Sequence, residues 1–198
     1  MKQAHRKFYV FASLITVLTL TSALLLALAP APLIPDASSS LFAIDAPDSM
    51  DVIFRTTTPT QRERWAYIYI HQSQTPGGNA LTLAQRRGGF GDHFVIGNGD
   101  GAIDGEIQIA QRWDAQMPAN PPIGAASMDP TCISICIIGD FDQARPTPTQ
   151  LRRLAQLVNT LQARFRIAAD HVMIAQASSP AGVGRHFPVQ DFRHLLLP

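Results

Sequence analysis

The sequence predicts an α/β or α+β domain from about residue 60 to the end of the chain, preceded by an N-terminal transmembrane helix. Two observations predict this arrangement. Strand-like segments alternate with helix-like segments in the second part of the chain, and a long uncharged stretch lies near its beginning. The 198 residues are enough for one hydrophobic core and an additional segment.

Composition excludes several classes of protein. The formal net charge is only +1, whereas a protein that neutralises nucleic-acid phosphates needs clustered lysine and arginine, so we expect no nucleic-acid partner. The two cysteines are too few for a disulfide-stabilised scaffold, and no Cys-x-x-Cys pair is present for a zinc ribbon.

The amino terminus has the features of a membrane anchor. Lys2, Arg6 and Lys7 precede an uncharged stretch over residues 8–29, which is long enough to span a hydrocarbon core of about 30 Å. A cleaved signal usually has a shorter apolar region, and Pro30 would follow the candidate cleavage site. The pattern therefore favours an uncleaved signal anchor over a buried helix of a soluble protein.

These features predict three parts of the chain. Residues 1–29 form a cytoplasmic basic end and the transmembrane anchor, residues 30–60 a tether rich in proline and serine, and residues 61–198 the folded domain. The positive-inside rule places this domain on the extracytoplasmic, periplasmic side of the membrane. If the signal is cleaved instead, the domain is secreted.

Three segments are predicted to be strands before residue 110. Residues 65–71 are rich in aromatic and β-branched side chains and lead to a Pro-Gly-Gly turn. Residues 93–96 and 106–109 flank the turn sequence Asn-Gly-Asp-Gly. Between the first two strands, residues 80–87 are a short helix candidate that ends at Gly88.

The third quarter of the chain predicts a buried strand and a long helix. Residues 132–138 form a continuous apolar run, which is typical of a strand buried on both faces. Thr147 is a candidate N-cap, with Pro148 at the first helical position and Gln150 at the capping-box position. From Leu151 to Phe165 apolar residues recur at helical spacing, so we expect one face of this helix in the core.

The two cysteines lie on the predicted strand 132–138 and share a face. Their Cα atoms would be roughly 13 Å apart in an extended strand, which is beyond the reach of a disulfide. We therefore expect Cys132 and Cys136 to be buried thiols that act as small hydrophobic side chains.

Six short motifs occur in a characteristic order. They are Trp65-x-Tyr67-Ile68-x-Ile70-His71, Gly91-x-His93-Phe94-Val95-Ile96-Gly97, Ile107-x-x-x-x-Arg112-Trp113, Ile135-Cys136-Ile137-Ile138-Gly139-Asp140-Phe141-Asp142, Pro146-Thr147-x-x-Gln150-Leu151 and Gly184-Arg185-x-Phe187-Pro188. Because these six motifs occur in this order, the chain resembles the type-2 N-acetylmuramoyl-L-alanine amidases, which share their fold with peptidoglycan recognition proteins and phage lysozyme-amidases. The resemblance implies an α/β fold with a central mixed β-sheet flanked by helices.

The resemblance also implies a zinc site, because these amidases hydrolyse the amide between the muramyl lactyl group and L-alanine with a zinc ion on three protein ligands. His71 matches the first ligand. The second and third ligand positions fall on Gln176 and Gly182, and Asp92 replaces a tyrosine that stabilises the tetrahedral intermediate. Of the three ligands that the resemblance implies, only His71 is thus present, and we expect no zinc cofactor and no catalytic residue.

Other residues have more than one interpretation. Alone, His71 is more often a satisfied histidine than a metal ligand, and His93 is expected to be structural. A rearranged metal site of His71, Asp92 and His186 is the alternative. Trp113 belongs either to the core or to a substrate groove, and Arg112 and Arg185 are candidate groove residues. The candidate substrate-binding residues are His71, Asp92, Arg112, Trp113, Gln176 and Arg185.

The sequence therefore predicts a membrane-tethered, catalytically inactive amidase-like domain that binds peptidoglycan or its muropeptides. Two alternatives stay open. One is an active amidase with a rearranged metal site, and the other is a module that binds another envelope protein.

Overall fold

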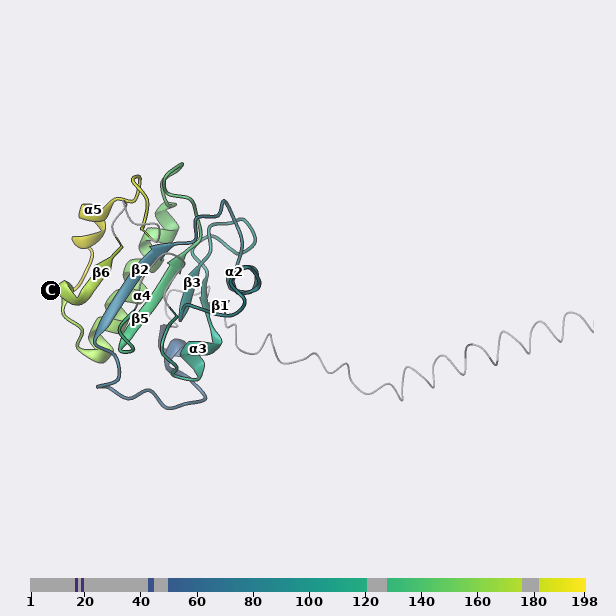
Figure 1. Ribbon diagram of the computed structural model, residues 1–198, viewed down its shortest axis with the longest axis horizontal. Coiled ribbons are helices and arrows are strands. Elements are labelled where there is room, and N and C mark those ends of the chain that lie inside the picture. Colours follow the sequence, from purple (N-terminus) through teal and green to yellow (C-terminus); the bar gives the residue numbers. More distant parts are fainter. Residues whose placement is uncertain (1–16, 18, 20–42, 45–49, 121–127, 176–181) are drawn as a thin grey trace, which may run out of the picture. The chain divides into compact units, whose positions relative to one another are not determined.

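A computed structural model describes residues 17, 19, 43–44, 50–120, 128–175 and 182–198 (Figure 1). The chain divides after Ser38, and the following unit, Ser39–Pro198, is described here by itself. Apart from residues 17 and 19, the predicted membrane anchor over residues 8–29 lies outside the described residues. Within the described part of the chain, no helix has both the length and the apolar character needed to cross a bilayer.

A six-stranded mixed β-sheet forms the centre of the fold (Figure 1), as the sequence analysis expected. The strands lie in the order β1-β4-β3-β5-β2-β6. Strands β3, β5, β2 and β6 are parallel neighbours, whereas β4 runs antiparallel to both β3 and β1. The strands are β1 (Ala43–Ile44), β2 (Tyr67–Gln72), β3 (Phe94–Ile96), β4 (Ile107–Ile109), β5 (Cys132–Ile137) and β6 (Val172–Ile174).

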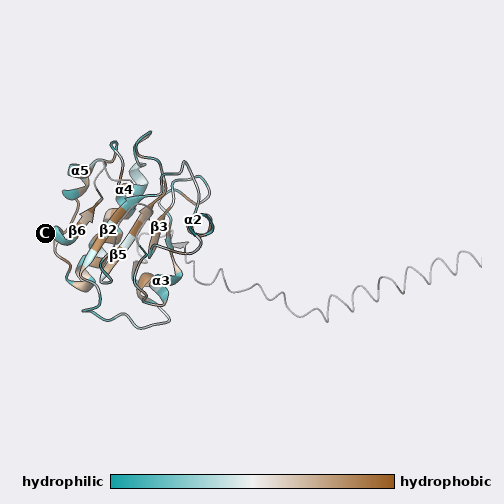
Figure 2. Cartoon of the chain, in the orientation of Figure 1, coloured by the Kyte–Doolittle hydropathy of each residue, from teal (hydrophilic) through white to brown (hydrophobic). Residues whose placement is uncertain are grey.

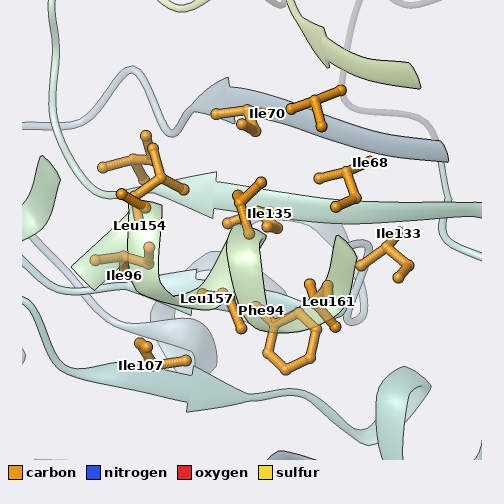
Figure 3. Packing of buried hydrophobic residues seen from close by; sticks show 14 of the residues in the cluster. Ile68, Ile70, Phe94, Ile96, Ile107, Ile133, Ile135, Leu154, Leu157 and Leu161 are labelled. Carbon is orange, nitrogen blue, oxygen red and sulfur yellow. The ribbon is translucent and has the colours of Figure 1, made fainter. Parts of the chain in front are cut away.

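Helix α4 (Pro148–Phe165) covers one face of the sheet, as Figure 1 shows. It begins as predicted: the side chain of Thr147 accepts a hydrogen bond from the backbone N–H of Gln150, and the Gln150 side chain accepts one from the backbone N–H of Thr147. Leu154, Leu157 and Leu161 are fully buried against the isoleucines of β2 and β5 (Figure 3). The hydrophobic residues accordingly concentrate on the central strands (Figure 2).

Helix α2 (Ala80–Arg87) covers part of the opposite face. Ala80 and Leu83 pack against Val95 and Cys136, whose neighbours along the strands, such as Phe94 and Ile135, face α4 instead. Asn79 caps the helix with a capping box, and Gly88 ends it with the left-handed φ of 71°. The helix ends where the sequence predicted.

The predicted strands at residues 93–96, 106–109 and 132–138 are confirmed within a residue or two. The first strand begins at Tyr67 rather than at residue 65, and the Trp65 side chain packs in the core against Trp113. The sequence analysis did not predict the short elements η1 (Met50–Phe54), α3 (Gln111–Asp114), η2 (Ala169–His171), β6 and α5 (Val189–Arg193).

The folded unit also begins before residue 61, the boundary expected from composition. Strand β1 pairs with β4, and Ile53 of η1 is fully buried in the main core cluster. Parts of the segment 30–60, which was expected to be a tether, therefore belong to the domain. Two short elements next to proline- and serine-rich sequence give no periodic signal, which is why composition missed them.

Candidate functional site

His71 lies near the carboxyl end of β2, on the sheet face opposite α4, and is fully buried. Its Nδ1 donates to the Gln72 carbonyl oxygen at 3.0 Å, because a carbonyl can only accept. Its Nε2 lies 2.7 Å from Oδ1 of Asp92. Both ring nitrogens therefore have an oxygen partner.

Asp92, in the loop between α2 and β3, is the centre of a buried network. Its Oδ1 accepts hydrogen bonds from His71 and from the Ser134 hydroxyl at 2.6 Å, and its Oδ2 accepts from the Arg87 guanidinium at 2.8 Å. Burial alone would raise the pKa of this carboxyl, but the charge and hydrogen bond of His71, the Arg87 charge and the Ser134 hydrogen bond outweigh burial and lower the pKa to about 2. Asp92 is thus ionised at neutral pH.

The protonation of His71 follows from these partners. An ionised carboxylate only accepts, so Nε2 carries a proton, and Nδ1 also carries one in order to reach the Gln72 carbonyl. In this arrangement both ring nitrogens face oxygen acceptors, so neither presents a free lone pair. While the hydrogen bond to Asp92 is closed, His71 acts neither as a general base nor as a metal ligand.

Cys136 lies beside His71. The two residues are register partners in the parallel β5–β2 pairing, and both side chains are fully buried. The ligand atoms of His71, Asp92 and Cys136 all lie within 4.8 Å of one another. Among the described residues, no other group of three or more histidines, cysteines or acids comes together in this way, and His186 is not part of the group. The rearranged set of His71, Asp92 and His186 is therefore not assembled.

Both cysteines are free and buried, as expected. Burial raises the pKa of Cys132 to about 12 and the pKa of Cys136 well above its ordinary value, so both are neutral thiols in this arrangement. The sequence analysis treated the two cysteines alike. The structure distinguishes them, because only Cys136 joins the group with His71 and Asp92.

The remaining ligand positions implied by the resemblance do not supply donors. Gly182 is buried and has no side-chain donor atom. Gln176 lies outside the described residues. The described residues at these positions thus do not fit the three-ligand zinc site of the amidases.

Two of the candidate groove residues have structural contacts. Trp113 is fully buried in the core, and its indole N–H donates to the Ile53 carbonyl, so the core interpretation matches the structure. Arg112 donates to the carbonyls of Phe90 and Pro118 and thereby connects two loops. Trp113 therefore belongs to the core, whereas Arg112 is partly exposed.

Arg185 is the candidate that stays open to solvent, with 70% of its side chain exposed. Its guanidinium lies 3.9 Å from Asp142, a weak contact at the surface. The Asp142 carboxylate also accepts from the Arg185 backbone N–H. The position of Arg185 is therefore fixed by its backbone while its charge remains available.

The sheet face that carries His71 is partly open along β2. Side chains alternate along the strand, so Tyr67 and Tyr69 point to the same face as His71, and both are half-buried. The Tyr69 ring packs against His71 with centroids 5.8 Å apart, and Tyr67 packs against His171 at 4.6 Å. Beside them, Met173 of β6 is 38% exposed. We call Tyr67, Tyr69 and Met173 the β2–β6 surface.

A separate cavity of about 410 Å³ lies beyond the carboxyl ends of β3 and β5, next to the start of α4. Its lining includes Asn98, Phe141 and Arg145, but neither Asp92 nor His71. The buried network therefore does not open into this cavity.

Sequence reasoning missed Arg87, Ser134 and Cys136. Ser134 did carry a signal, because a hydroxyl in an otherwise apolar buried strand requires a hydrogen-bond partner. The roles of Arg87 and Cys136 depend on strand register and on the path of the α2–β3 loop, which one sequence does not reveal.

The family model described as N-acetylmuramoyl-L-alanine amidase matches residues 61–188. No curated protein matches the chain. Similar solved structures include the N-acetylmuramoyl-L-alanine amidase LysC from Clostridium intestinale URNW, at 20% identity and a TM-score of 0.44, covering 71% of this chain and 91% of that chain.

Two further similar structures are peptidoglycan recognition proteins by name. PGRP-Hd from Alvinella pompejana is 16% identical with a TM-score of 0.44, and the match covers 73% of this chain and 94% of that one. Bumblebee PGRP-SA is 17% identical with a TM-score of 0.40, and the match covers 64% of this chain and 80% of that one.

Proposed function

The chain belongs to the N-acetylmuramoyl-L-alanine amidase family, and from this premise we propose that it is a membrane-tethered peptidoglycan-binding protein that does not hydrolyse its ligand. The absence of hydrolysis is inferred from the hydrogen bonds of His71. Its Nε2, the nitrogen available to a metal, donates to Asp92 at 2.7 Å instead.

Hydrolysis in this family needs a zinc ion with an open position for water and substrate. The family positions do not fit that ion, since His71 is closed by Asp92 and Gly182 has no donor atom. Asp92 also stands where the resemblance places a tyrosine. An ionised carboxylate at that position repels a developing oxyanion, whereas a phenol would donate to it.

Access supports the same conclusion. His71 is fully buried and Asp92 is 4% exposed, so a scissile amide has no path to either side chain. The network is also held from three directions, by α2 through Arg87, by β5 through Ser134 and by β2 through His71. A substrate would have to displace all three contacts in order to reach the histidine.

Binding is assigned to the β2–β6 surface. Aromatic rings and a thioether present flat apolar area to the carbon-bound faces of sugars and to alanine methyl groups. Burial, together with the Asp92 charge, raises the pKa of Tyr69, so its phenol keeps a proton to donate. The exposed guanidinium of Arg185 suits the carboxylates of a peptide stem.

The tether and the location outside the cytoplasm rest on the sequence of residues 1–29. A basic end followed by a long uncharged stretch supports an anchor with its amino terminus in the cytoplasm. Peptidoglycan lies on the other side of that membrane, which is the side on which this topology places the folded domain.

The experiment uses the full chain in detergent micelles, mixed with purified sacculi and sedimented. We expect retention on sacculi above that on insoluble cellulose, and no release of free peptide stems above a reaction without protein. Absence of retention overturns the binding proposal. Release of stems that a chelator abolishes overturns the loss of hydrolysis.

A further inference from the structure

We propose that the cavity of about 410 Å³ beyond the carboxyl ends of β3 and β5 binds a short peptide whose amino and carboxyl ends are both free. Asp140 binds the ammonium end of this peptide, and Arg145 binds its carboxylate end. The inference goes beyond peptidoglycan binding at the β2–β6 surface. It is also independent of the buried network around Asp92, which does not open into this cavity.

The connections of the sheet place the cavity where two neighbouring strands lead to opposite faces. Strand β2 continues into α2, which covers one face, and its neighbour β5 continues into α4, which covers the other. The two connecting loops therefore separate at the carboxyl ends of the strands and leave a crevice between them. In open α/β sheets, ligands bind in such crevices. Pro76 of the first loop and Ala144 of the second both line this one.

The walls of the cavity are held in place by their own hydrogen bonds. The Asn98 side chain, in the loop after β3, donates to the Pro76 carbonyl at 2.7 Å. The Ser73 hydroxyl accepts from the backbone N–H of Gly139 at 3.0 Å, which joins the loops after β2 and β5. Because these walls are already ordered, a ligand that enters the cavity loses little binding energy to further ordering of the protein.

The size and the apolar lining of the cavity suit a short peptide. Small-molecule sites enclose roughly 300–1,000 Å³, so about 410 Å³ matches a small organic molecule rather than a single ion or a polymer strand. Ile138 and Phe141 form a buried part of the lining, and Pro76 and Ala144 are exposed. These side chains offer apolar contact to small side chains of a bound peptide.

Two opposite charges on the loop after β5 line the cavity without neutralising each other. The ion pairs among the described residues include neither Asp140 nor Arg145. Oδ1 of Asp140 accepts from the Asp142 backbone N–H at 3.1 Å, while within the part of the chain that the structure describes its Oδ2 has no donor. Arg145 is exposed, and no described residue accepts a hydrogen bond from its guanidinium.

A ligand with one positive and one negative end pairs with both groups at once. A guanidinium binds a carboxylate through two parallel hydrogen bonds, and a carboxylate accepts from an ammonium group. A ligand with a single charge leaves one of the two residues unpaired. The formal charges of the lining side chains cancel, so the cavity as a whole attracts neither anions nor cations. Its lining therefore favours a zwitterion.

The test is isothermal titration calorimetry of the full chain in detergent with trialanine, without peptidoglycan. We expect saturable binding at one site. Acetylation of the amino end and amidation of the carboxyl end should each weaken binding about fivefold, as expected for the loss of one partly exposed charge contact. Absence of saturable binding in the millimolar range, or equal binding of trialanine and the peptide blocked at both ends, overturns the proposal.

Two variants assign the ends of the peptide. Arg145→Gln should bind trialanine about fivefold more weakly and should no longer distinguish it from its carboxyl amide. Asp140→Asn, which keeps an oxygen for the Asp142 N–H, should no longer distinguish trialanine from its acetylated form. Arg152→Gln is the matched control, because Arg152 is an exposed arginine on α4 outside the cavity lining.

Equal weakening by Arg152→Gln overturns the site, as does full discrimination of both peptide ends in Arg145→Gln and Asp140→Asn. Thermal midpoints verify that each variant is folded. Retention on sacculi is measured separately. A chain that binds trialanine without being retained on sacculi keeps this site and loses the proposed function, and the converse result does the opposite.

Discussion

Nη1 of Arg87 lies 2.8 Å from Oδ2 of Asp92, and this ion pair ties the last residue of α2 to the loop before β3. The same carboxylate holds His71 through its other oxygen. One anion thus joins three segments of the chain, α2, the loop before β3, and β2. Its removal leaves the Arg87 charge without a counter-ion and His71 without its carboxylate partner.

Asp92→Asn should therefore destabilise the protein by about 3–5 kcal/mol, as expected when one partner of a buried ion pair is lost. Urea unfolding of the full chain measures the loss. Asp142→Asn is the control, because the contact of Asp142 with Arg185 is exposed and should contribute at most about 1 kcal/mol. Equal losses in the two variants would contradict the role of Asp92.

His93 gives the protein a pH-dependent stability. Its Nε2–H donates to the Met117 carbonyl and its Nδ1 accepts from the Ser134 backbone N–H, so the buried ring is neutral. Burial lowers the pKa of His93 from 6.5 to about 4. Between these two values the unfolded chain binds a proton that the folded chain does not, so stability falls as the pH decreases.

We expect a decrease of about 3 kcal/mol between pH 7 and pH 4. His93→Gln keeps one acceptor and one donor but does not titrate, so its unfolding free energy should change less over that interval. Urea midpoints at several pH values measure both proteins. If the two proteins have parallel profiles, His93 does not control acid stability.

Gly184 occupies a position that only glycine fits. Its φ is +79°, and a Cβ there would lie 2.5 Å from the backbone of Phe141. Gly88 has a similar φ of +71° but open space around it. Gly88→Ala should therefore cost about 1 kcal/mol from backbone strain alone, and Gly184→Ala about 1–3 kcal/mol more from overpacking. Urea unfolding compares the two, and equal costs would show that the loop at Phe141 moves freely.

The sheet and its covering helices were predictable because their signals are local. The caps at Thr147 and Gly88 define helix ends, and the apolar run on β5 is typical of a strand buried on both faces. The short elements β6 and α5 were missed, because segments of three to five residues carry no measurable periodicity.

The site was less predictable, because it depends on register. The sequence indicates that His71 is alone among the expected ligands, but it does not show that β5 brings Cys136 beside it. Asp92 appeared in the sequence only as a candidate substrate-binding residue and a possible ligand of a rearranged site, whereas in the structure it is 4% exposed and bound on both oxygens. Its partners lie 5, 21 and 42 residues away, beyond any local pattern.

The β2–β6 surface gives a direct test of binding, because its aromatic side chains do not belong to the buried network. Tyr67→Ala and Tyr69→Ala should each weaken retention on sacculi roughly fivefold, since a stacked aromatic ring contributes about 1 kcal/mol beyond its buried area. Tyr69→Phe keeps the ring and should retain most of the affinity. Leu81→Ala is the matched control, because Leu81 is a comparably exposed apolar side chain on α2.

Cosedimentation at several protein concentrations measures each affinity, with thermal midpoints to verify folding. Equal weakening by Leu81→Ala, or none by either tyrosine variant, would place peptidoglycan elsewhere on the domain.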